Sequence, residues 1–192
     1  MALYVLSPVK RQAQQLYVAV VEQSRQPFLY KDLAIPDTLD GRFDAIILHM
    51  FLIVRRFRRE PTARFLSLAR MLQEAFISDM DRSLREMGVG DTGVGVRVKK
   101  MAGALAGRMR AYEAAADESA MAEALARNVY RGAAGHAEHV RQLAAYMLKG
   151  IAVLDTRTAS EIAAGDIAFA AQANESSGGA ASSDALRSTV RR

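Results

Sequence analysis

The chain has 192 residues, of which 51% are hydrophobic and 24% charged, and this composition excludes a chain without a folded core. It contains no cysteine, which excludes disulfides, thiolate nucleophiles and cysteine-ligated metal centres. The net charge of +5 favours encounters with anionic surfaces, whether RNA, the acidic leaflet of a bilayer or an acidic partner.

The first predicted helix spans residues 8–25. Ser7 and Pro8 are a typical N-cap and first helical residue, and apolar residues then recur at helical spacing until Pro27 ends the run. The segment 27–41 contains two prolines and ends at a glycine, so we predict an ordered loop there. Among its apolar side chains we single out those of Phe28, Leu29, Tyr30 and Ile35.

A second helix is predicted from residue 38 to residue 59. Its stretch FDAIILHMFLIVRR, residues 43–56, has apolar side chains on every side, and such a helix belongs in a protein interior. The apolar run is too short to cross a bilayer, which requires roughly 20 residues. We therefore expect this helix at the centre of a soluble core, with the arginines at 55–59 complementing the negative end of its dipole.

The rest of the chain predicts five further helices and a tail. The helices are expected at 62–87, from 94 onwards, at 118–131, at 136–154 and at 159–169, with a glycine-rich bend at 88–95. We predict an all-α protein with a single globular domain, residues 1–170, in which six or seven helices surround the central helix. Residues 171–192 are rich in Ala, Ser and Gly and are predicted to form a flexible tail.

The polar residues of the predicted helices do not form a recognisable catalytic or metal site. His49 is predicted to be a core residue that binds a backbone carbonyl or a nearby carboxylate. His136 and His139 lie three residues apart, but a zinc site needs three or four donors, so we interpret them as solvated helix-end residues. The acids between 79 and 86 are spaced for ion pairs with neighbouring arginines on the helix surface. We predict no catalytic residue, no metal and no cofactor.

The segment 93–110 contains five basic residues and no acid: Arg97, Lys99, Lys100, Arg108 and Arg110. One interpretation is a docking site for an anionic surface, formed together with the arginines at 55–59. The other is a solvated face that neighbouring acids balance. No nucleic-acid-binding motif accompanies these residues.

Two stretches resemble the ubiquinol–cytochrome c chaperone family, the assembly factors of respiratory complex III in mitochondria and alphaproteobacteria. The first is LYKDLAIPDTLDGRFDAIILH, residues 29–49, with an aromatic residue, a Pro-Asp-Thr turn, and Gly-Arg-Phe before an apolar helix that contains a histidine. The second is FISDMDRSLREMGVGDTGVGVRVKKM, residues 76–101, with an Asp-rich helix end and a Gly-Val-Gly-Asp bend. The resemblance extends over residues 15–131 and more loosely to 155.

The resemblance implies a helical, non-enzymatic chaperone that binds newly made cytochrome b. The chain looks like the bacterial form, without an N-terminal signal peptide, so we expect it in the cytoplasm, with a peripheral position at the inner membrane face. The ribosome and an anionic membrane surface are the other expected partners.

Under this hypothesis an apolar surface edged by basic residues holds the client. Asp37 and Arg42 are expected to order the loop through charge-assisted bonds, and the basic residues at 97–100 are expected to dock the membrane or the client. The candidate binding residues are Phe28, Leu29, Tyr30, Ile35, Asp37, Arg42, Phe43, His49, Asp79, Arg97, Lys99 and Lys100.

Two other hypotheses involve His49. The alternative function is a module that binds a small hydrophobic ligand, a lipid or a quinone, in a pocket near His49 between the helices at 38–59, 62–87 and 94 onwards. The third hypothesis is an enzyme with His49 as a general base beside Asp44 or Tyr30, which requires that His49 line an open cleft.

Overall fold

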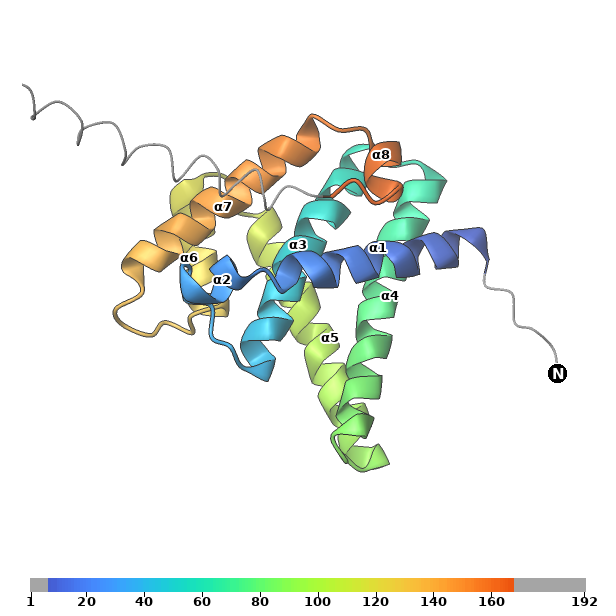
Figure 1. Ribbon diagram of the computed structural model, residues 1–192, viewed down its shortest axis with the longest axis horizontal. Helices are drawn as coiled ribbons and strands as arrows, with labels where there is room; N and C mark the ends of the chain where they lie inside the picture. The colour runs from blue at the N-terminus through green and yellow to red at the C-terminus, as the bar shows by residue number, and fades with distance from the viewer. Residues whose placement is uncertain (1–6, 168–192) are drawn as a thin grey trace, which may run out of the picture.

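The computed structural model describes residues 7–167, and within this range it contains eight helices and no strand. The prediction of an all-α protein is confirmed. Figure 1 shows the helices, which are α1 (Pro8–Ser24), α2 (Pro27–Lys31), α3 (Leu39–Arg59), α4 (Ala63–Glu86), α5 (Asp91–Glu113), α6 (Glu118–Asn128), α7 (Ala137–Asp155) and α8 (Ala159–Ala163). None of the helices within this range is long and apolar enough to cross a membrane.

The central position predicted for the helix at 38–59 is confirmed by α3. It packs against α1, α4, α5, α7 and α8 (Figure 1). Every residue from 43 to 54 is buried, so more than three turns have no side facing water. Because burying one large aliphatic or aromatic side chain contributes about 1.5–3 kcal/mol, this helix is the main hydrophobic contribution to the fold.

The arginines at the C-terminal end of α3 connect it to the end of α7 and to the linker that follows it. Arg55 and Arg59 both bind the carboxylate of Asp155, with nitrogen–oxygen distances of 3.0 and 2.8 Å. Arg56 donates two hydrogen bonds to the backbone carbonyl of Arg157, at 3.0 and 2.7 Å. These arginines therefore join distant parts of the chain, in addition to their place at the end of the helix dipole.

The short helix α2 lies where a loop was predicted. Pro27 occupies its first turn, where the missing N–H costs nothing, and Leu29 is fully buried. After α2 the backbone N–H of Ile35 donates to the carbonyl of Leu29, at 3.0 Å. Five residues are too few for helical periodicity to be visible in the sequence, which explains the difference.

The distal ends of α4 and α5 form an arm, residues 81–100, that extends away from the other helices (lower part of Figure 1). Leu84 and Val94 are buried in the arm but lie outside the main core cluster. The glycine-rich bend is shorter than predicted, because α5 begins at Asp91, with Gly90 as N-cap. An acid in the first turn suits the positive end of the helix dipole.

The C-terminal boundaries are also shorter than predicted. The helix expected at 118–131 ends at Asn128, and the chain turns at Gly132, which has a φ of +70°. The helix expected at 159–169 ends at Ala163, followed by Gly165 with a φ of +101°. The predicted tail, 171–192, lies outside the described residues.

Gly41, in the first turn of α3, is required by close packing, so Gly41→Ala should destabilise the protein. A Cβ there would overlap the backbone carbonyl of Pro36. Because this carbonyl belongs to the backbone, it cannot move aside as the end of a flexible side chain could. We expect a loss of about 1–3 kcal/mol in the free energy of unfolding, measured by chemical denaturation. Gly103→Ala is the control: nothing lies within 4 Å of the added Cβ, and we expect a gain of about 0.5–1 kcal/mol. Equal changes in the free energy of unfolding for Gly41→Ala and Gly103→Ala would contradict the claim that close packing requires Gly41.

Candidate functional site

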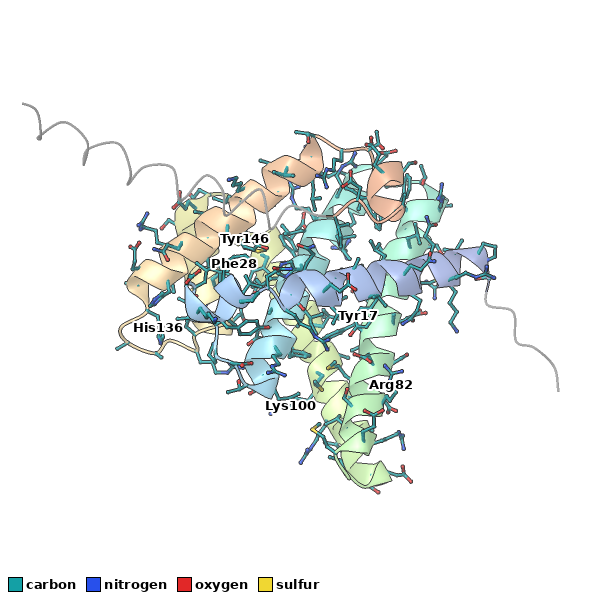
Figure 2. All side chains as sticks on the ribbon, in the orientation of Figure 1. Tyr17, Phe28, Arg82, Lys100, His136 and Tyr146 are labelled. Carbon is teal, nitrogen blue, oxygen red and sulfur yellow. The ribbon has the colours of Figure 1, made fainter. Side chains whose placement is uncertain are left out.

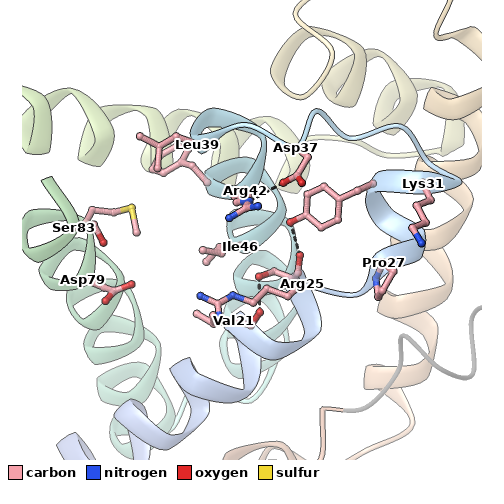
Figure 3. A pocket seen from close by; sticks show the side chains of 14 residues that line it. Val21, Arg25, Pro27, Lys31, Asp37, Leu39, Arg42, Ile46, Asp79 and Ser83 are labelled. Atoms are coloured by element: carbon pink, nitrogen blue, oxygen red, sulfur yellow. Dashed lines mark hydrogen bonds and ion pairs between the residues drawn. The ribbon is translucent and has the colours of Figure 1, made fainter. Parts of the chain in front are cut away.

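An open groove of about 960 Å³ lies between the C-terminal end of α1, α2, the start of α3, and α4 (Figure 3). Its lining includes five of the residues predicted from the sequence: Tyr30, Asp37, Arg42, Phe43 and Asp79. The groove thus brings together residues from both stretches that carry the family resemblance.

The floor of the groove is apolar. Phe43, Ile46 and Met80 line it with only their edges accessible, since each is between 6% and 8% exposed. Leu39, which begins α3, stands at the rim with 52% of its surface exposed. The groove therefore offers apolar contacts to an incoming side chain.

The ring of Phe43 is fixed by contacts with two other side chains. Its ring packs against Phe76, with 5.2 Å between centroids, and the guanidinium of Arg108 lies 5.4 Å from its centroid. Such ring–ring and cation–π contacts orient an aromatic side chain as well as bury it. The floor is therefore preformed.

The rim of the groove is charged, with an excess of cations. Arg42 and Asp37 form an exposed ion pair at 2.7 Å, and the hydrogen bond from Arg42 lowers the pKa of Asp37. Arg25 and Lys31 add two exposed cations (Figure 3). Asp79 already forms an ion pair with Arg82, a residue that does not line the groove.

Two tyrosine hydroxyls fasten the walls to each other. Tyr30 donates to the backbone carbonyl of Ser24 at 2.7 Å, which ties α2 to the end of α1 (dashed in Figure 3). Tyr17 donates to Asp79 at 2.8 Å, which ties α1 to α4. Burial raises the pKa of both hydroxyls, so they keep their protons and remain donors at neutral pH.

Phe28, Leu29 and Ile35, the other three apolar residues singled out in the sequence, do not line the groove. Leu29 and Ile35 are at most 2% exposed and belong to the main core. Phe28 is half-buried and meets the ring of Tyr146 edge-on, with 5.4 Å between centroids. The structure therefore places these residues as anchors of the segment, and Tyr30 alone among the four lines the groove.

His49 is a core residue, as predicted. It is 1% exposed, and its two ring nitrogens lie 2.7 Å from the carbonyl of Ala45 and 2.9 Å from the hydroxyl of Tyr146. Burial lowers its pKa to about 4, so the imidazole is neutral at pH 7. It faces α7 and does not line the groove, so it lacks the open cleft that the general-base hypothesis requires.

Asp44 is a buried charge whose role the sequence does not reveal. Its carboxylate lies 2.7 Å from Arg108 and 3.2 Å from Arg131, and it has no exposed surface. Burial raises its pKa to about 6, and the two arginines oppose that rise, so Asp44 is ionised at neutral pH. Arg108 lies 64 positions after Asp44, so local spacing could not have predicted the pair.

The remaining predicted residues lie elsewhere. Arg97, Lys99 and Lys100 are exposed on α5 and are not among the lining of the groove. His136 stacks on Tyr130, with 5.0 Å between centroids, and lies 5.6 Å from the ring of His139. Residues 7–167 contain no group of three or more side chains that could hold a metal ion.

The buried His49 predicts a pH dependence of stability. Its pKa is about 4 when folded and about 6.5 when unfolded, so acidification protonates the unfolded chain first. Stability should fall by about 3 kcal/mol between pH 6.5 and 4 from this group alone. His49→Gln lacks that contribution, whereas the opposite contribution of Asp44 is common to both proteins. Denaturation midpoints across this range should show a smaller acid loss in the variant; identical slopes would contradict the assignment.

Comparisons with known proteins agree with this fold. The profile of the Ubiquinol-cytochrome C chaperone family matches residues 31–169. The crystal structure of the Cbp3 homolog from Brucella abortus is similar, with 35% sequence identity and a TM-score of 0.72 over 81% of this chain and 87% of that chain. No curated protein matches the sequence. From the extent of the family match and of the structural similarity, the chain belongs to the ubiquinol–cytochrome c chaperone family.

Proposed function

We propose that the protein is an assembly chaperone of the ubiquinol–cytochrome c reductase complex and that it holds newly made cytochrome b in the groove. The family and the similar structure support a role in complex III assembly. The proposal involves binding and release only, with no chemical step and no cofactor. It places the protein in the cytoplasm, where the client's segments are still exposed to water.

The observation that carries the proposal is the meeting of two distant sequence stretches across the groove. Tyr30, Arg42 and Phe43 come from residues 29–49, whereas Asp79 and Met80 come from residues 76–101. Residues that contribute only to packing need not converge on an accessible surface. These five do converge there, which supports a binding role for the groove.

The groove has the properties that a membrane-protein client requires. An unpacked transmembrane segment presents large apolar side chains that need cover, while its flanking residues stay hydrated. The floor of Phe43, Ile46 and Met80 can cover apolar side chains, and the charged rim remains in water. The groove is open rather than enclosing, which suits a complex that must later release its client.

Leu39 offers a sharp test because it is exposed at the rim and lies at the first position of α3. An acid is favourable at a helix N-terminus, so Leu39→Glu should fold normally while placing a charge in the groove. We expect capture of cytochrome b segments, measured by crosslinking to the purified protein, to fall about tenfold or more, because a leucine contact of about 1.5–3 kcal/mol is lost.

The matched control is Leu66→Glu. Leu66 is 46% exposed near the start of α4 and does not line the groove. In a strain without the gene, the wild type and Leu66→Glu should restore assembled complex III, and Leu39→Glu should not. Normal complex III without the gene would contradict the function, whereas equal capture by both variants would contradict only the site. A lipid or quinone retained in native mass spectrometry, and not displaced by client, would favour the small-ligand alternative.

A further inference from the structure

The outward face of α5 is a second accessible surface, distinct from the groove. The packed side of α5 carries Val94, Leu105 and Met109, each at most 4% exposed. At 100° per residue, Val96, Gly103 and Gly107 fall on the opposite side. The helix has 23 residues and is about 35 Å long, so this face is a long and narrow strip.

Four cations stand on or beside this face without acidic partners. Arg97, Lys99, Lys100 and Arg110 are all exposed, and none forms an ion pair within residues 7–167. The sequence from 92 to 112 contains no acid. In Figure 2, Lys100 lies on the side of the arm away from Arg82, which belongs to α4. The positive charge is therefore concentrated on α5.

The arginines of α4 within or beside the arm form ion pairs with acids, unlike the four cations of α5. Arg82 is bound to Asp79, and Arg85 is bound to both Asp81 and Asp91. These pairs neutralise the α4 side of the arm. The contrast shows that the excess charge on α5 is a local arrangement rather than a consequence of the net charge of +5.

Exposed apolar side chains accompany the cations. Val96 is 68% exposed, the largest value among the exposed large hydrophobic residues of the described chain, and Met87 at the end of the arm is 53% exposed. Gly103 and Gly107 leave the middle of the strip without side chains, so the helix backbone can come close to a flat partner. A cluster of four cations on one helix is typical of segments that bind anionic lipid headgroups, and Val96 adds an apolar side chain at the same surface.

We propose that the outward face of α5 docks the protein on the surface of a bilayer that contains anionic phospholipids. Lipid phosphates would pair with Arg97, Lys99, Lys100 and Arg110, and Val96 would enter the boundary between headgroups and acyl chains. A single-stranded RNA would instead require exposed aromatic rings for stacking, and the aromatic residue of α5, Tyr112, is 1% exposed. The proposal does not depend on the identity of the client.

The test uses the full chain and sedimentation with vesicles of phosphatidylcholine, with or without phosphatidylglycerol. We expect binding only when phosphatidylglycerol is present, and weaker binding as salt rises. The triple variant Arg97→Gln, Lys99→Gln and Lys100→Gln should lower vesicle affinity on the order of a hundredfold, since each cation contributes about fivefold.

A second triple variant controls for net charge. Lys10→Gln, Arg11→Gln and Arg58→Gln remove the same charge from exposed positions on α1 and α3 and should keep vesicle affinity. Leu39→Glu in the groove should also keep it. The proposal would be overturned by an equal loss of vesicle affinity in both triple variants or by a loss of vesicle affinity with Leu39→Glu. Tighter binding to single-stranded RNA than to the anionic vesicles would also overturn it. Circular dichroism of each variant checks that the helices are retained.

Discussion

Burial of α3 on all sides is the constraint on which the rest of the structure depends. A helix whose residues 43–54 are all buried needs other helices around it, and α1, α4, α5, α7 and α8 supply that cover. The two polar side chains among residues 43–54 have partners: His49 contacts Ala45 and Tyr146, and Asp44 lies between Arg108 and Arg131. An unmatched charge there would cost several kcal/mol, about as much as a small domain's whole stability.

The groove arises where this cover is incomplete. Leu39, in the first turn of α3, is half exposed there, and Phe43 and Ile46 in the following turn each keep an accessible edge. The anchored 27–41 segment forms one wall, and α4 forms the other. The walls are held by hydroxyl hydrogen bonds from Tyr17 and Tyr30, so the groove exists before a client arrives and little ordering entropy opposes binding.

The sequence predicts the core better than the surface because hydrophobic periodicity reports burial. It identifies α3, its central position and the core role of His49. It cannot show which way the apolar residues of a short irregular segment point, so Leu29 and Ile35 entered the candidate list although the fold buries them. Nor can it bring together Asp44 and Arg108, or separate Arg97 from the groove, because those relations exist only after the helices pack.

The central claim is that the groove holds the client, and site-specific photo-crosslinking in cells that assemble complex III tests it most directly. A photoreactive residue would replace either Arg25, which lines the groove, or Arg58, which is exposed on α3 outside it. The account predicts crosslinks to cytochrome b from position 25 and none from position 58. Crosslinks from 58 alone, equal crosslinks from both, or crosslinks from neither would contradict it.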